Sequence, residues 1–265
     1  MLSRMEPSTY FVSDLHMFSR RSQAAAHEQA IHARAKRART FVLGGDIFDF
    51  RWSTLGSVET TVRASVDWVD RLVSQNPDCQ FHFVAGNHDY NQRFLDAINA
   101  YATQSPNLQF HHYYLRLAGS IFLHGDAADH PTMCANRLES NRQHWLADET
   151  RGPMKHLLYD LAMKARLHRL AGVIHPKRKV AQRLLGYLDR IGHGPGTGLE
   201  HVYFGHTHQA MANYELGGLM FHNGGAPMAG LQFRIVEAQH DSESAPSSHP
   251  ASPAVGQPVS ASVQA

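Results

Sequence analysis

Residues 80–89 read "QFHFVAGNHD", an apolar run that ends at a glycine followed by Asn87, His88 and Asp89. The apolar half predicts a buried β-strand, because it is short and rich in Phe and Val. The polar half permits two interpretations, since Asn, Asp and Gly are also ordinary turn residues. These three side chains are either a polar turn or one corner of a reaction centre, and the rest of the chain must distinguish the two.

The same pattern, a short apolar run that ends in small or polar residues, recurs along the chain. It is found at 9–12, 40–43, 120–123 and 201–204. Helical patterns at 24–39 and 56–75 separate the first three strands, which predicts crossover connections and mostly parallel pairing. Residues 111–126 predict a hairpin, and three further short strands follow residue 208. We therefore expect an α/β fold of two packed sheets, one from each half of the chain, with helices outside.

Composition narrows the class of protein and its compartment. No apolar run approaches the roughly 20 residues of a membrane-spanning helix, and no apolar stretch of signal-peptide length precedes the first strand. We therefore expect a cytoplasmic protein. Cys79 and Cys134 form neither a disulfide framework nor a CxxC pair. The formal charge of +2 argues neither for nor against an anionic partner.

Five polar phrases directly follow predicted strands. They are "SDLH" (13–16), "GGDIFD" (44–49), "GNHD" (86–89), "HGD" (124–126) and "GHTH" (205–208). Residues beyond the carboxyl ends of strands in open α/β sheets converge on one crevice. Asp, His and Asn offer oxygen and imidazole nitrogen, which suit Mn, Fe or Zn. Two divalent ions about 3.5–4 Å apart also need a carboxylate that reaches both. The candidate ligands are Asp14, His16, Asp46, Asn87, His124, His206 and His208.

In this order the phrases resemble the signature of the calcineurin-like metallophosphoesterase superfamily: D-x-H, G-D-x-x-D, G-N-H-D, H-G and G-H-x-H. The resemblance implies a four-layer αββα sandwich. It also implies two divalent ions, Mn²⁺ in the first place and Fe or Zn as alternatives. Asp14, His16 and His208 would bind the first metal. Asn87, His124 and His206 would bind the second, with Asp46 as the bridge.

The resemblance also implies a mechanism, in which a metal-bound hydroxide attacks phosphorus in line and the ions neutralise the developing charge. His88 would stabilise that charge or protonate the leaving oxygen, and Asp89 would orient His88. On this interpretation "GNHD" is a metal ligand beside a candidate acid, and not a simple turn.

Residues 131–190 predict helices with two apolar stripes, and they hold 12 Lys and Arg against 5 Asp and Glu. They lie between "HGD" and "GHTH", where the family's UDP-2,3-diacylglucosamine hydrolases carry a helical cap over the site. This chain departs from those hydrolases at His88, where they commonly read G-N-R-D. A basic cap would suit a phosphoester or pyrophosphate substrate, lipid-linked and reached at the inner face of the membrane. The alternative is an amphipathic helix pair that packs on the core.

Two other functions stay open at this stage. One is a nucleic-acid or nucleotide phosphodiesterase, which would bind its substrate through the basic residues 131–190. The other is a non-catalytic scaffold, which would bind metal but hydrolyse nothing. We expect one metallophosphoesterase domain over residues 1–239, with the cap inserted in it. The Ser/Pro/Ala-rich residues 240–265 predict a disordered tail.

Overall fold

The computed structural model describes residues 8–146, 154 and 176–239. The predicted tail lies outside these residues. So does the first apolar stripe of the predicted cap, Leu157, Leu158, Leu161 and Ala165, apart from its first member, Met154. Within the described ranges, no helix is both long and apolar enough to cross a membrane.

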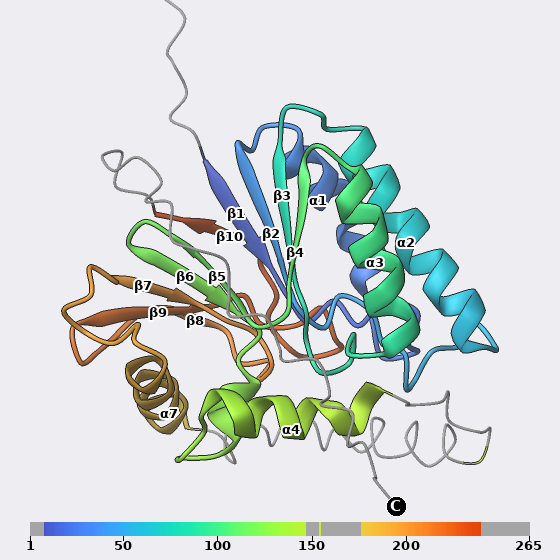
Figure 1. Ribbon diagram of the computed structural model, residues 1–265. Helices are drawn as coiled ribbons and strands as arrows, with labels where there is room; N and C mark the ends of the chain where they lie inside the picture. The colour runs from blue at the N-terminus through green and yellow to red at the C-terminus, as the bar shows by residue number, and fades with distance from the viewer. Residues whose placement is uncertain (1–7, 147–153, 155–175, 240–265) are drawn as a thin grey trace, which may run out of the picture.

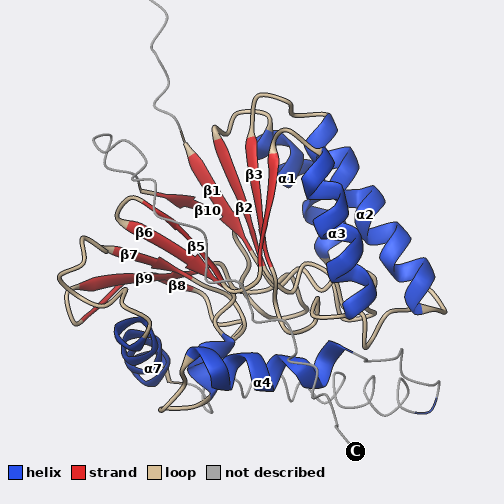
Figure 2. Cartoon of the chain, in the orientation of Figure 1, coloured by secondary structure: helices blue, strands red, loops and turns tan. Residues whose placement is uncertain are grey.

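Two five-stranded sheets pack face to face, with helices on the outer faces (Figures 1 and 2). The first sheet has the strand order β10-β1-β2-β3-β4. Its strands are β1 (Thr9–Val12), β2 (Thr40–Gly44), β3 (Gln80–Val84), β4 (Leu108–His111) and β10 (Val236–Ala238). Its helices are η1 (Ala24–His27), α1 (Glu28–Ala35), α2 (Val58–Ser74) and α3 (Gln92–Gln104). Strands β1 to β4 are parallel to one another, as the crossover pattern predicted.

The second sheet has the order β5-β6-β7-β9-β8. Its strands are β5 (Tyr114–Leu117), β6 (Ser120–Leu123), β7 (His201–Tyr203), β8 (Met211–Leu216) and β9 (Leu219–Asn223). The helices on this side are η2 (Asp126–Asp129), α4 (Ala135–Leu146) and α7 (Lys177–Arg190). The predicted αββα sandwich is confirmed, with β5 and β6 as the predicted hairpin.

The strands of the first sheet bury both faces, because helices cover one side and the second sheet covers the other. Phe41 and Phe81 pack in the cluster under α2 and α3. Val42 and Val84 lie on the opposite face of the same strands and pack in one cluster with Phe122 of the second sheet. This two-sided burial explains why these strands read as continuous apolar runs.

The last strand departs from the prediction that each half of the chain builds one sheet. Strand β10 returns to the first sheet and pairs antiparallel with β1, with Phe11 opposite Val236. Helix α3 and strand β4 are also absent from the elements predicted above. Phe94, Leu95 and Ile98 nevertheless give α3 a buried face at helical spacing.

Helix α7 is part of the sandwich core. Its apolar stripe, predicted to belong to the cap, buries Val180, Leu184 and Leu188 in one cluster with residues of β6, β7 and β9. Figure 1 shows α7 against the outer face of the second sheet and α4 crossing below both sheets. Of the predicted cap, α7 therefore packs as the outer layer of the second sheet.

A buried pair of histidines predicts acid sensitivity of the fold. His82 Nδ1 lies 3.1 Å from His111 Nε2. Burial, reinforced by the neighbouring histidine, lowers the pKa of His82 to about 3, and burial lowers that of His111 to about 4. The unfolded chain, with histidine pKa values near 6.5, therefore binds more protons than the folded chain below about pH 6.5. The free energy of unfolding should fall as the pH drops from there towards 4, by on the order of 3 kcal/mol from each of the two histidines.

Urea unfolding at a series of pH values measures this fall. The double variant His82→Gln/His111→Gln should lose less stability between pH 7 and pH 4 than the unmodified chain. His144→Gln, at an exposed helix position, is the matched control and should leave the slope unchanged. An identical pH dependence for the double variant would rule out this explanation.

Candidate dinuclear metal centre

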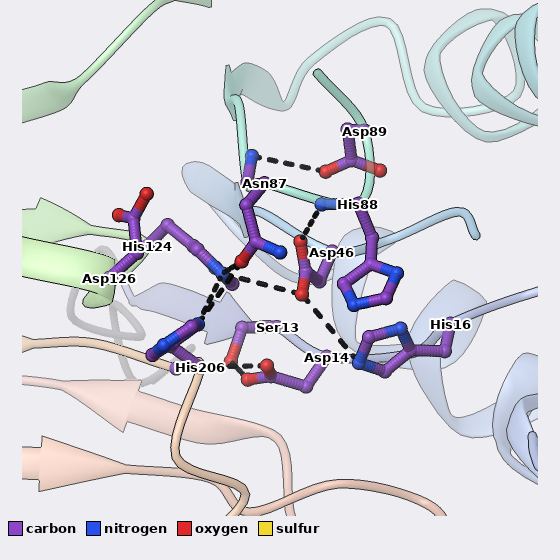
Figure 3. A network of polar contacts seen from close by, with 12 residues as sticks. Ser13, Asp14, His16, Asp46, Asn87, His88, Asp89, His124, Asp126 and His206 are labelled. Carbon is purple, nitrogen blue, oxygen red and sulfur yellow. Dashed lines mark hydrogen bonds and ion pairs between the residues drawn. The ribbon is translucent and has the colours of Figure 1, made fainter. Parts of the chain in front are cut away.

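All seven predicted ligands lie together, in the loops that follow β1, β2, β3, β6 and β7. The ends of parallel strands from both sheets meet at this edge of the sandwich, so loops far apart in the chain become neighbours. Figure 3 shows side chains from these loops pointing toward one another. Asp14, His16, Asp46, Asn87 and His124 are buried, whereas His206 and His208 lie at the half-buried rim.

The backbone at this edge is unusual, because five of the seven residues adopt left-handed φ angles. These are Asp14 (55°), His16 (45°), Asp46 (52°), His206 (64°) and His208 (53°). Such φ values are uncommon outside glycine and cost of order 1–3 kcal/mol each where the surroundings impose them. Their concentration in these loops indicates that the fold places these side chains at the expense of backbone strain.

The first group of candidate ligands is Asp14, His16 and His208. His208 Nε2 lies 3.0 Å from His16 Nε2 and 3.5 Å from Asp14 Oδ1. Burial, with help from Arg21, lowers the pKa of His16 to about 3. Burial and the nearby His16 hold the pKa of His208 well below its usual value. Both imidazoles are therefore neutral near pH 7, and with the carboxylate of Asp14 they form a set of nitrogen and oxygen atoms of the kind that fits a divalent cation.

The second group is Asn87, His124 and His206. Asn87 Oδ1 lies 3.0 Å from His124 Nε2 and 3.1 Å from His206 Nδ1, and the two ring nitrogens are 3.3 Å apart. The other ring nitrogen of His124, Nδ1, lies 3.4 Å from the carbonyl oxygen of Gly44. That carbonyl favours a proton on Nδ1 and leaves Nε2 directed at the group. Two nitrogens and an amide oxygen thus converge, which again suits a divalent cation.

Asp46 lies between the two groups. Its Oδ2 is 3.3 Å from His124 Nε2 and 3.7 Å from His16 Nε2, while its Oδ1 accepts a 2.7 Å hydrogen bond from the His88 amide. Burial alone would raise the pKa of Asp46, but His124 and His88 hold it well below its usual value. Asp46 is therefore an ionised carboxylate with one oxygen turned toward both groups, as a bridging ligand requires.

His88 is held by Asp49 and not by Asp89. His88 Nδ1 lies 3.0 Å from Asp49 Oδ1. The carboxylate of Asp89, which we expected to orient His88, instead accepts hydrogen bonds from the amides of Ile47, Phe48 and Gly86. Three backbone donors exceed what a single imidazole offers, so Asp89 fixes the loop after β2 onto the loop after β3. The carboxylate that orients His88 is that of Asp49, the last residue of "GGDIFD", to which the sequence interpretation assigned no role.

Asp49 also links His88 to Arg21. Arg21 Nη2 is 2.9 Å from Asp49 Oδ2 and 2.9 Å from His16 Nδ1. Burial would raise the pKa of Asp49, but His88 and Arg21 hold it well below its usual value. The carboxylate therefore stays ionised and can accept a hydrogen bond from His88 Nδ1–H across the neutral pH range.

The indole ring of Trp145, in α4, packs beside the imidazole of His88. Its ring centroid is 4.9 Å from that of His88, and the Arg51 guanidinium lies over the indole at 3.7 Å. One helical turn earlier, the fully buried Arg142 makes two 2.8 Å hydrogen bonds to Asp126, two residues after His124. Helix α4 is thus tied to the loop of one candidate ligand and covers the side chain of the candidate acid. Sequence patterns gave no signal for Trp145, because its partners His88 and Arg51 lie 57 and 94 residues away in the chain.

The family model of the calcineurin-like phosphoesterases matches residues 7–210 of this chain. The chain belongs to this family. As a calcineurin-like phosphoesterase it is a metal-dependent hydrolase of phosphoester bonds. Two of its side-chain groups are compact enough to hold a metal ion, Asp14 with His16 and His208, and Asp46 with His124 and His206. No curated protein matches the sequence.

Among solved structures, the chain is similar to a dimetal phosphatase from Danio rerio. The two share 11% sequence identity over 84% of this chain and 88% of the other, with a TM-score of 0.43. At this level the similarity carries no argument about the substrate or the site of this phosphoesterase.

Gly86 is expected to be essential to the metal centre of this phosphoesterase. A Cβ atom at Gly86 would come within 2.3 Å of both Asp46 N and Asp46 Oδ1, so Gly86→Ala must displace the central carboxylate. We expect metal affinity to fall at least about tenfold, as for other losses of ligand orientation. Gly119→Ala is the matched control, since its Cβ would meet only ordinary contacts at 3.5 Å. Calorimetric titration of the metal-free proteins with Mn²⁺ compares them, and equal affinities would contradict the expected displacement.

Proposed function

We propose that this chain hydrolyses a phosphodiester or pyrophosphate bond at the dinuclear centre formed by the seven predicted ligands. The observation that carries the proposal is the position of Asp46, whose Oδ2 faces both His124 and His16. Two divalent cations, Mn²⁺ first and Fe or Zn as alternatives, would activate a water molecule and neutralise charge on the phosphoryl oxygens when bound. An intact ligand set beside a candidate acid argues for catalysis over a metal-bound scaffold.

His88 supplies the proton that the leaving oxygen needs. Its Nδ1 faces Asp49, so Nε2 is the nitrogen available to a substrate. Its ring packs edge-on against His16, with centroids 4.7 Å apart, and 15% of its side chain remains exposed. A histidine that is fixed by a carboxylate, borders the ligands and stays open to solvent can donate at the leaving group or stabilise its charge.

The substrate in this proposal is a UDP-linked, acylated pyrophosphate or a close chemical relative. Helix α4 carries Trp145 and reaches the candidate acid, which supports a substrate-contacting role for the segment that α4 begins. Lys and Arg of that segment would pair with phosphate oxygens, and its apolar surface would bury an acyl chain. In this proposal the protein is cytoplasmic and reaches its lipid-linked substrate at the inner face of the membrane.

The substrate test compares two esters on two proteins. Residues 147–175 are replaced by a Gly/Ser segment of equal length, which leaves α4 and the core helix α7 in place. Hydrolysis of a small nitrophenyl diester should stay within a few-fold of the original. Hydrolysis of the UDP-linked, acylated pyrophosphate should fall about 100-fold or more in kcat/KM, because binding energy from remote parts of the substrate is lost.

Three outcomes separate the alternatives. If neither ester is hydrolysed by the intact protein loaded with Mn²⁺, the scaffold interpretation replaces catalysis. Equal losses on both esters in the Gly/Ser variant, with unchanged unfolding, would make the segment structural and remove the lipid-linked substrate. Tight DNA or RNA binding that weakens steeply with salt would favour a nucleic-acid phosphodiesterase instead.

A further inference from the structure

Asp129, the last residue of the 3-10 helix η2, contacts the outer nitrogen of a candidate metal ligand. Its Oδ1 lies 2.8 Å from His206 Nε2. The inner nitrogen of the same ring, Nδ1, lies 3.1 Å from Asn87 Oδ1 and 3.3 Å from His124 Nε2. The imidazole of His206 therefore spans from the second group of ligands to a carboxylate at the rim.

The contact with Asp129 determines which nitrogen of the His206 ring carries the proton. A neutral imidazole carries its proton on one nitrogen and offers a lone pair on the other. A carboxylate only accepts hydrogen bonds when it is ionised, so the Asp129 contact requires the proton on Nε2. Nδ1 is then left as the lone-pair donor, and it is the nitrogen that faces Asn87 and His124.

The turn that carries Asp129 is fixed by a second element. Arg183 of α7 donates from Nη1 to the carbonyl oxygens of Ala128 and Asp129, at 2.8 and 3.0 Å. Half of the Asp129 side chain is exposed, at 49%. The side chain of Arg183 therefore fixes the backbone of Asp129, although the carboxylate itself lies at the surface. This keeps the carboxylate within hydrogen-bonding distance of His206.

We infer that Asp129 is a positioning residue that fixes His206 with Nδ1 toward the metal centre. The inference rests on the proposed function, since it takes His206 as a metal ligand. His124 obtains the equivalent restraint from a backbone carbonyl, that of Gly44. Of the two histidines of the second group, His206 is thus the one that contacts a side-chain carboxylate through its outer nitrogen, so a single substitution can remove that contact.

The test measures metal binding and not turnover. Metal-free protein is titrated with Mn²⁺ by calorimetry, which resolves two sites where their affinities differ. Asp129→Ala should weaken one of the two sites by about 10–100-fold, the usual effect of losing a carboxylate partner of a ligating histidine, and should leave the other unchanged. Asp129→Asn keeps an oxygen acceptor and should recover most of the lost affinity. Asp67→Ala, at an exposed position on α2, is the matched control and should bind as the unmodified chain does.

His206→Ala separates failure of this inference from failure of the proposed function. If His206→Ala binds two ions with unchanged affinity, the ligand assignment itself is wrong. If His206→Ala weakens one site while Asp129→Ala binds as the original does, the positioning role of Asp129 is overturned. Equal weakening of both sites by Asp129→Ala, or failure of Asp129→Asn to recover affinity, would show a general structural effect and would also overturn it.

Discussion

Asp46→Asn is expected to abolish the activity almost completely and to remove at least one bound metal. Asp46 Oδ2 is the oxygen that faces both ligand groups, at 3.3 Å from His124 and 3.7 Å from His16. The Asn side chain preserves the oxygen that accepts from the His88 amide but carries no charge to offset two cations. Several kcal/mol of lost charge stabilisation correspond to a fall in kcat/KM of about 10³-fold or more.

His16→Ala is the comparison for this prediction. His16 belongs to only one ligand group, so its loss should leave the other group able to hold an ion. Metal content and kcat/KM for a nitrophenyl diester are measured for both variants. If His16→Ala is as inactive as Asp46→Asn and retains no more metal, the bridging role of Asp46 between the two ligand groups is contradicted.

His88→Asn is expected to lower kcat by roughly 10²–10⁴ for a substrate with a poor leaving group, because a positioned acid contributes that much. The loss should be smaller for nitrophenyl esters, whose leaving oxygen needs no proton. His88 is not among the candidate ligands, so the metal content should not change. Equal losses on the two substrates would remove the role as acid and leave only stabilisation of charge.

Asp49→Asn tests the orientation of the same histidine. Because His88 Nδ1 contacts Asp49 Oδ1 at 3.0 Å, this variant should reproduce part of the His88 effect, with the same dependence on leaving group. Asp49 also contacts Arg21, so the unfolding of the variant must be compared with that of the original. A loss that is independent of leaving group would place Asp49 outside the positioning of His88.

The position of the site could be predicted from sequence because its residues follow strands. A short apolar run before each phrase, such as "FHFVA" before "GNHD", predicts where a parallel strand ends. Strand ends of one sheet share an edge, so the order of the phrases was sufficient to place Asp14, Asp46 and Asn87 together. The left-handed φ angles of five candidate ligands could not be predicted, since none of the five is a glycine.

Roles within the site were harder to predict, because neighbours in sequence are not partners in space. Asp89 adjoins His88 in the chain, yet its carboxylate accepts from the backbone amides that follow β2. The partner of His88 is Asp49, 39 residues away, whose side chain lies 3.0 Å from Nδ1. Spacing within one phrase carries no information about which of two carboxylates reaches an imidazole.

The second half of the chain shows the same limit for apolar patterns. The stripe of Val180, Leu184 and Leu188 predicts an amphipathic helix, and α7 is one. A stripe does not specify which surface it covers, and α7 packs on the second sheet. Similarly, "LQFRIVEA" predicts a strand, but its pairing with β1 across the whole chain depends on tertiary contacts.

The number of metal ions per folded chain tests the central claim most directly. Protein stripped with a chelator, reconstituted with excess Mn²⁺ and freed of unbound metal by gel filtration is analysed by elemental mass spectrometry. Two separate ligand groups linked by Asp46 predict two manganese ions per chain, and fewer in Asp46→Asn. Less than one ion per chain in the unmodified protein, with the fold intact, would contradict the dinuclear centre.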